Sequence, residues 1–210
     1  MLILVEIIFA ALLVRLCWLL FCIHSGRTKI ASKNRKSIKA AVVIGSGGHT
    51  TEMLRLVQAL HAEKYSPRIY FLASNDTTSE VKIHKLEDRR EGEYEVIRIP
   101  RSRNVSQSFI TSFATTLYAV VAVIPHMLSR RPELILCNGP GTCIPICFIA
   151  FIMRILCICD NRIVFVESIC RVKTLSLTGK FLLFFADELF VQWPNLKHLH
   201  KRVNYVGRLS

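Results

Sequence analysis

The stretch from residue 40 to residue 60 constrains the fold of this chain more than any other. It reads AAVVIGSGGHTTEMLRLVQAL, which is a short apolar run, a glycine-rich turn and an apolar stripe at helical spacing. A continuous β-branched run is typical of a buried parallel strand, and glycines let the backbone turn sharply and approach a ligand. The start of a helix favours an anion, because free N–H groups and the positive end of the helix dipole lie there. The stretch therefore predicts an α/β fold with a phosphate-type ligand site.

Two other interpretations of this turn exist: a tight βα turn without a ligand, and the cofactor loop of a nicotinamide-dependent oxidoreductase. The dinucleotide fingerprint requires a third glycine, but Thr50 occupies that position. It also requires an acid after the second strand, where the chain reads Ala73-Ser74-Asn75. The sequence thus leaves the ligand site and the plain turn open, and it disfavours an oxidoreductase.

Beyond this stretch, apolar runs alternate with helical stripes up to the end of the chain. This alternation predicts a doubly wound parallel sheet, in which ligands bind beyond the carboxyl ends of the strands. We expect strands over 40–44, 68–72, 94–99, 133–137, 162–166, 187–192 and 203–206, and helices over 50–62, 78–88, 107–130, 142–157, 175–186 and 194–201.

Residues 1–23 are almost wholly apolar, interrupted by Glu6 and Arg15. About twenty apolar residues are enough for a helix to cross a bilayer, and here the basic residues follow the apolar run instead of preceding it. By the positive-inside rule, 1–23 is an uncleaved transmembrane anchor, 24–39 a basic linker and 40–210 a cytosolic domain. Placing the charged Arg15 side chain in the bilayer core costs free energy. Three explanations are therefore open: the side chain snorkels to the membrane surface, it pairs with a neighbouring helix, or the whole segment lies in the membrane–water interface.

The segments 109–128 and 144–158 are too apolar for ordinary surface helices. Either they are buried against the sheet, or one face rests on the bilayer. The net charge of +13 suits an anionic lipid surface or a phosphorylated substrate. Nucleic acid is not an expected partner, because zinc-finger spacing and the aromatic RNP pattern are both missing. The eight cysteines lie mostly in apolar runs and are expected to be buried free thiols.

Polar and glycine residues gather in the loops that follow the predicted strands. His49 stands at a helix start and is a candidate general base. The loop after the third strand holds two arginines, whose forked donors suit diphosphate oxygens. The fourth loop is a second glycine turn that opens a helix, and Glu167 follows the fifth strand. The candidate site residues are Gly45, Ser46, Gly47, Gly48, His49, Thr50, Arg101, Arg103, Asn138, Gly139, Gly141 and Glu167.

Each of these loops also has a plainer interpretation. In that interpretation the glycines only allow the chain to turn, the arginines belong to a basic loop exposed to solvent, and Glu167 forms an ion pair with Arg171. A D-x-D or other carboxylate pair that would hold a metal and a nucleotide is missing from the sequence. The residue pattern thus points away from a metal-dependent transferase or hydrolase and predicts no metal site.

A set of sequence blocks resembles one known family. In order, the blocks are VVIGSGGHTTEMLRL, RIPRSRNVSQS, LILCNGPGTCIPIC, VFVESICRVKTLSLTGK, FVQWP and YVGR. The chain is similar to the membrane-anchoring subunit of the eukaryotic two-chain UDP-N-acetylglucosamine transferase. That family adds the second N-acetylglucosamine to dolichol-pyrophosphate-linked N-acetylglucosamine at the cytosolic face of the endoplasmic reticulum. More distantly, the domain resembles the amino-terminal half of bacterial MurG, a GT-B glycosyltransferase.

The resemblance implies that this domain binds the lipid acceptor and requires no cofactor. It places the crossover to the second GT-B domain at 205–208, so a separate subunit is expected to bind UDP-N-acetylglucosamine. The glycine loop is expected to grip the acceptor pyrophosphate, with His49 deprotonating the accepting hydroxyl and Glu167 close to the acceptor. A scaffold that recruits a self-sufficient catalytic partner remains the alternative. The residues expected at the interface with the partner are Gly207, Arg208, Leu209 and Ser210.

Overall fold

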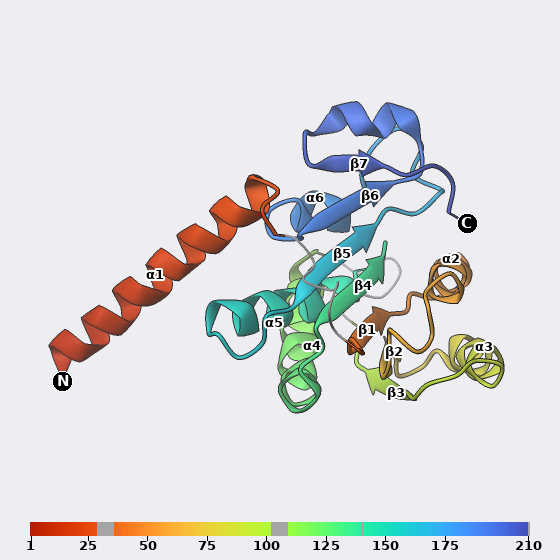
Figure 1. Ribbon diagram of the computed structural model, residues 1–210, viewed down its shortest axis with the longest axis horizontal. Coiled ribbons are helices and arrows are strands. Elements are labelled where there is room, and N and C mark those ends of the chain that lie inside the picture. The colour runs from red at the N-terminus through yellow and green to blue at the C-terminus, as the bar shows by residue number, and fades with distance from the viewer. Residues whose placement is uncertain (29–35, 102–108, 140, 210) are drawn as a thin grey trace.

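A computed structural model describes residues 1–28, 36–101, 109–139 and 141–209. Its centre is a parallel sheet with the strand order β3-β2-β1-β4-β5-β6-β7 (Figure 1). All neighbouring strands pair in parallel. The strands are β1 (Ala40–Val43), β2 (Arg68–Ala73), β3 (Tyr94–Ile99), β4 (Leu134–Asn138), β5 (Arg162–Val166), β6 (Glu188–Val191) and β7 (Val203–Tyr205).

The predicted doubly wound sheet is confirmed, and each predicted strand matches an observed one to within one residue at either end. The central strands β1, β2 and β4 are buried along their whole length, which is why they are apolar except for the buried Arg68 at the start of β2 and Asn138 at the end of β4. Several helix predictions were too long. The helix expected over 50–62 begins two residues earlier and ends at Gln58, four residues before the expected end. The segment expected over 175–186 is helical only in α6 (Leu177–Leu182), and 194–201 forms the shorter 3₁₀ helix η1 (Pro194–Leu199).

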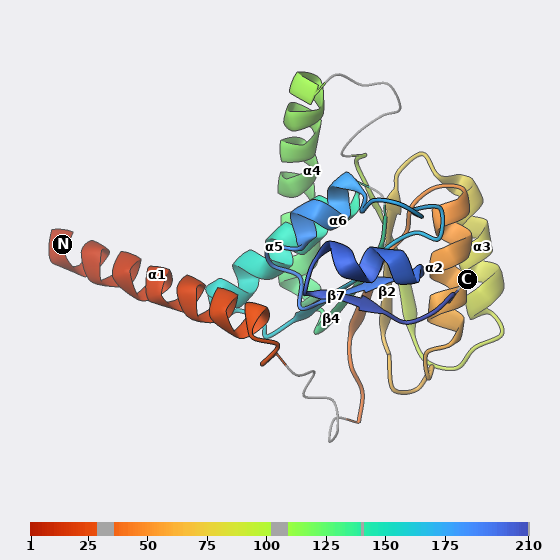
Figure 2. The same ribbon diagram turned by 90° about the horizontal axis from the view of Figure 1, so that it is seen from above.

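Two layers of helices cover the sheet (Figures 1 and 2). Helices α2 (Gly48–Gln58) and α3 (Thr77–Glu87) lie on one face, and α4 (Phe109–Arg130), α5 (Cys143–Ile155) and α6 lie on the other. The core is divided accordingly, since alternate residues of a strand point to opposite faces. Val42 and Tyr70 pack on the side of α2 and α3, and Val43 and Phe71 pack on the side of α4, α5 and α6.

Helix α1 (Leu2–His24) projects away from the sheet (Figure 2). It is long and apolar enough to cross a membrane, and only 6% of the residues in its most apolar 18-residue stretch are buried in the protein. Helix α1 contacts α5, Ile23 belongs to the core cluster on that side of the sheet, and Leu16 and Leu20 pack against this cluster. The candidate anchor and the domain therefore share part of one hydrophobic core.

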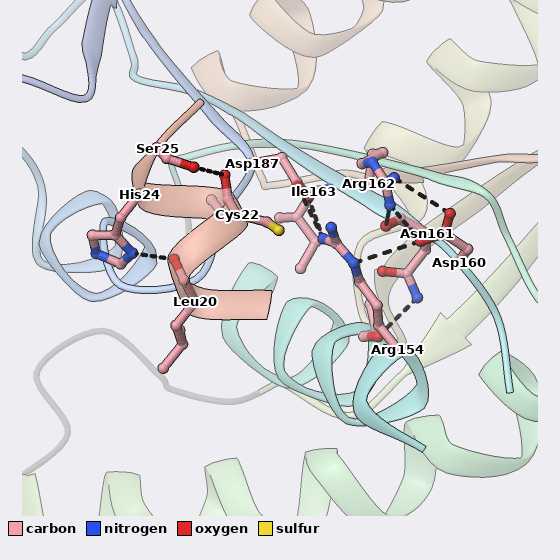
Figure 3. Close-up of polar contacts among 12 residues, drawn as sticks. Leu20, Cys22, His24, Ser25, Arg154, Asp160, Asn161, Arg162, Ile163 and Asp187 are labelled. Atoms are coloured by element: carbon pink, nitrogen blue, oxygen red, sulfur yellow. Dashed lines mark hydrogen bonds and ion pairs between the residues drawn. The ribbon is translucent and has the colours of Figure 1, made fainter. Parts of the chain in front are cut away.

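A buried polar cluster lies beneath the end of α1 (Figure 3). Arg154 Nη1 donates to both carboxylate oxygens of Asp187 at 2.8 and 3.0 Å, and Asp187 also accepts from the Ile163 N–H at 2.9 Å. Arg154 Nε lies 3.6 Å from Asp160 Oδ1. Burial opposes ionisation of Asp160, but a hydrogen bond from Arg162 and the charges of Arg154 and Arg15 hold its pKa below the usual value. The charge of Arg15 contributes to this lowering, whereas its role in the anchor stays a prediction.

Candidate functional site

The candidate site lies where the strand order reverses, between β1 and β4. In doubly wound sheets this switch point, at the carboxyl ends of the strands, is where ligands bind. A pocket of about 450 Å³ opens there. It is lined by Gly48, His49, Glu52, Gly139, Glu167, Ser168, Cys170, Arg171 and Ser176.

The glycine turn after β1 leaves the start of α2 open. Gly47 precedes the helix with φ of 66°, a conformation that favours glycine, and a Cβ atom on Gly47 or Gly48 would meet nothing within 4 Å. No side chain in the described part of the chain caps this helix. Its first N–H groups therefore remain available to an anion.

Thr50 has a different place from the rest of the turn. It is fully buried, and its hydroxyl donates to the Gly45 carbonyl and lies 2.7 Å from Ser79 Oγ. Gly45 is buried as well, whereas Ser46, Gly47 and Gly48 are exposed. The buried Thr50 side chain therefore stabilises the turn, and the exposed Gly47 and Gly48 are the part of the turn that a ligand can reach.

His49 belongs to a buried hydrogen-bond network that crosses the sheet edge. Its Nδ1 lies 2.9 Å from Asn138 Oδ1. The Asn138 amide donates to Glu52 Oε2 at 3.1 Å and to the Val166 carbonyl at 3.2 Å. Glu52 also accepts from Ser168 Oγ at 2.8 Å and from the Ile169 N–H at 3.2 Å. The network joins α2, β4 and the loop after β5.

Gly139 fixes the position of the imidazole. Its φ is 74°, and a Cβ atom added there would lie 2.4 Å from His49 Cε1 and 2.7 Å from Nδ1. A larger residue would displace the ring, so a glycine at position 139 is what allows the second turn to pack closely against His49. Gly141 has open space around it and precedes α5.

The Glu167 carboxylate is buried and accepts from the Ser176 N–H at 2.8 Å and from the Ser168 N–H at 3.3 Å. Burial raises the pKa of Glu167, against the opposing effect of these N–H groups and of the Arg171 charge. The ion pair with Arg171 favoured from the sequence is wrong, since among the described residues the carboxylate binds backbone N–H groups instead. Gly179 makes room for it, because a Cβ atom there would lie 2.6 Å from Oε2.

Arg101 and the described residues at the end of the chain do not line this pocket. Arg101 follows β3 at the edge of the sheet, two strands from β1. Arg103 and Ser210 lie outside the described residues. The end of the chain runs beside β6: the Leu209 N–H donates to Gln192 Oε1 at 2.9 Å, and the Arg208 guanidinium lies 4.6 Å from the centre of the Trp193 ring.

Five pocket residues are not among the predicted site residues: Glu52, Ser168, Cys170, Arg171 and Ser176. Glu52 lies three residues after His49 and hence on the same face of α2, which was the available signal. Ser168 and Ser176 are brought to the pocket by the loop after β5, and no local pattern marks them.

Comparisons with known proteins support one family. Residues 40–209 match the family model described as "Oligosaccharide biosynthesis protein Alg14 like". The chain is 47% identical over 184 residues to UDP-N-acetylglucosamine transferase subunit ALG14 of Mus musculus, covering 83% of this chain and 84% of that protein. The Candida albicans subunit of the same name is 38% identical over 209 residues, covering 98% and 95%.

Among solved structures, the chain resembles Acinetobacter baumannii MurG with a TM-score of 0.56 at 15% sequence identity. The match covers 80% of this chain but only 45% of the MurG chain. At this identity the likeness concerns the fold alone, and it agrees with the GT-B-like half predicted from the sequence.

Proposed function

This chain belongs to the Alg14-like family of oligosaccharide biosynthesis proteins, which confirms the resemblance predicted from the sequence blocks, and from that premise we propose its specific role. It is the membrane-anchoring, acceptor-binding subunit of a transferase that moves N-acetylglucosamine from UDP-N-acetylglucosamine to GlcNAc-pyrophosphate-dolichol. A separate chain binds the nucleotide sugar, and the complex acts at the cytosolic face of the endoplasmic reticulum membrane. The observation that carries this proposal is the pocket that combines an open helix N-terminus with a histidine ring.

The proposed chemistry uses the two sides of this pocket. The N–H groups at the start of α2 bind the acceptor pyrophosphate, and Arg171, which lines the pocket, adds positive charge. His49 takes the proton of the accepting hydroxyl as that oxygen attacks the anomeric carbon and UDP departs with the bonding electron pair. Glu167 accepts hydrogen bonds from sugar hydroxyls. A single displacement of this kind inverts the anomeric centre.

Reconstitution tests this assignment. The full chain in lipid vesicles is assayed with UDP-N-acetylglucosamine and a pyrophosphate-linked GlcNAc lipid, with and without the purified donor-binding subunit. We expect product only when both chains are present. Nucleotide titration of this chain alone should give no binding, and a uridine-nucleotide site on the isolated chain would contradict the division of labour.

The membrane role is supported by the helices on the α1 side of the sheet. On α4, Leu117, Tyr118 and Val121 are exposed at helical spacing, and Phe181 and Phe184 are exposed on and just after α6. The segments α4, α5 and α6 contain no acidic residue, whereas α2 and α3 do. Apolar helices that carry no carboxylate of their own suit an anionic leaflet. We propose that this face rests on the bilayer that α1 crosses.

Lipid photolabelling should detect this face directly. The full chain is placed in vesicles whose phosphatidylcholine carries a diazirine at the end of one acyl chain, and labelled peptides are identified by mass spectrometry. We expect label on α1 and also on the peptides with Tyr118 and Phe184. The exposed Val81 of α3 is the matched control, because it is 67% exposed on the opposite face. Label confined to α1 would contradict contact of the face with lipid, and absence of label from α1 would contradict the span.

The end of the chain is the proposed contact for the donor-binding subunit. Deleting 207–210 should abolish co-purification of the two subunits. The thermal unfolding temperature should change little, because the described contacts of this end are peripheral: the hydrogen bond from Leu209 to Gln192 and the contact of Arg208 with the Trp193 ring. Lys201→Ala, at an exposed position outside the deleted residues, is the control. Retained co-purification after the deletion would refute this assignment.

A further inference from the structure

The hydrogen bonds around Asn138 decide which nitrogen of His49 carries a proton. The Asn138 side chain is fully buried. One end of its amide faces Glu52 Oε2 and the Val166 carbonyl, and both of these are acceptors only. The NH₂ group must therefore point toward them, and the amide oxygen must point toward His49 Nδ1, 2.9 Å away. An amide oxygen accepts but cannot donate, so Nδ1 of His49 has to be the donor.

We propose that Asn138 and Glu52 are positioning residues that hold His49 as its Nδ1–H tautomer. In this tautomer the lone pair of the neutral ring is on Nε2. That nitrogen makes no hydrogen bond to the described residues, and the ring lines the pocket. The tautomer assignment stands on geometry alone, whereas its use in proton abstraction rests on the proposed function.

Glu52 determines the orientation of the Asn138 side-chain amide. It is 7% exposed, and both of its carboxylate oxygens accept hydrogen bonds: Oε1 from Ser168 Oγ, and Oε2 from the Ile169 N–H and the Asn138 amide. A reversed amide would place its oxygen against the carboxylate and the Val166 carbonyl, leaving buried acceptors facing one another. The buried negative charge, connected through Asn138, also stabilises the imidazolium that forms when Nε2 takes a proton.

This arrangement gives Asn138 a role different from ligand binding. Its amide protons are both donated within the network, and its oxygen is directed at His49. The residue therefore acts through the imidazole and does not need to touch the acceptor. By the same reasoning, Glu52 acts on His49 only through Asn138 and lies further from the reacting atoms than Asn138 does.

Nitrogen NMR of the imidazole tests the inference. The full chain, labelled with ¹⁵N-histidine and assembled with its partner in detergent micelles, is titrated with pH. The His49 signals are assigned by their loss in His49→Gln. We expect Nδ1 to show the shift of a protonated nitrogen and Nε2 that of an unprotonated one when the ring is neutral. A neutral ring protonated mainly at Nε2 would overturn the proposal.

Two variants at Glu52 separate positioning from packing. Glu52→Met removes the acceptor while keeping the chain length, and it should mix the two tautomers and lower kcat about 10- to 100-fold with little change in KM, the range typical of residues that orient a functional group. Glu52→Gln keeps one oxygen for the Asn138 amide and turns its NH₂ toward Ser168, so it should retain the Nδ1–H tautomer and lose less turnover. Equal tautomer ratios in the two variants would refute the role of Glu52.

The same data distinguish this inference from the proposed function. If His49 is held as the Nδ1–H tautomer but His49→Gln keeps full turnover, the positioning network is real and the catalytic assignment fails. If His49→Gln abolishes turnover while the wild-type tautomers are mixed, the network fails and the catalytic assignment stands. Should Glu52→Met not fold, Asn138→Leu, which has a similar size but offers no acceptor to Nδ1, should mix the two tautomers. A ring that stays in the Nδ1–H form in Asn138→Leu would contradict the proposal.

Discussion

Replacing His49 with glutamine is expected to lower kcat of the reconstituted two-subunit transferase about 100- to 10,000-fold, the contribution of a positioned general base. Glutamine keeps a polar side chain beside Asn138 but provides no basic nitrogen at the position of Nε2. KM for the lipid acceptor should change little, because the pyrophosphate contacts are assigned to the backbone at the start of α2. Initial rates with radiolabelled UDP-N-acetylglucosamine, measured over a series of acceptor concentrations, separate the two parameters.

His61→Gln is the matched control for this substitution. His61 is exposed in the segment after α2 and does not line the pocket. Its replacement removes an imidazole from the same side of the sheet without touching the proposed site, and turnover should stay at the wild-type level. If a complex with His49→Gln assembles normally and keeps full turnover, the chain is a scaffold that recruits a catalytic partner and contributes no base.

Replacing Arg154 with methionine is expected to lower the free energy of unfolding by about 3–5 kcal/mol, the usual effect of leaving one member of a buried ion pair alone. The side chains of Arg154 and Asp187 are 2% and 1% exposed. Without the guanidinium, Asp187 would keep the Ile163 N–H as the donor at its Oδ2 but lose the charge that balances it. Urea unfolding of the full chain in a mild detergent, followed by circular dichroism, measures the change.

Two further variants show whether this loss arises from the unpaired charge. Arg162→Met removes a guanidinium whose partner, Asp160, is 62% exposed, so the loss should be at most about 1 kcal/mol. Asp187→Leu combined with Arg154→Met replaces both charges by apolar groups and should recover much of the stability. Equal losses in Arg154→Met and Arg162→Met would contradict the buried pair as a source of stability.

The sheet could be predicted from the sequence because its signal is local. Buried strands such as β1 are apolar along their whole length, β4 is apolar up to Asn138, and the turns and helices between them repeat that signal at regular intervals. Two of the overlong predictions, around α6 and η1, share a cause. Apolar residues such as Phe185 and Leu196 pack into the core from segments that are too short for regular helices, so hydrophobic periodicity alone overestimates the helix.

The site could be predicted only in part. His49 and its glycines stand in one local motif, and Glu167 follows a strand whose position was correctly predicted. The contacts between these residues are not local: Glu52 and Ser168 are separated by 116 positions along the chain. The predicted pairing of Glu167 with Arg171 was wrong for the same reason, since backbone N–H groups brought by the next loop satisfy the carboxylate.

The contribution of Ile23 to the core has a consequence for biogenesis. This side chain belongs to a helix that leaves the ribosome before any strand of the sheet, and Leu16 and Leu20 of the same helix pack against the cluster that contains it. The sheet therefore completes its packing against a segment that is synthesised first. Cleavage of this helix, as in the removal of a secretory signal peptide, would not release an intact soluble domain. It would expose the apolar surface that the helix covers and leave an aggregation-prone product.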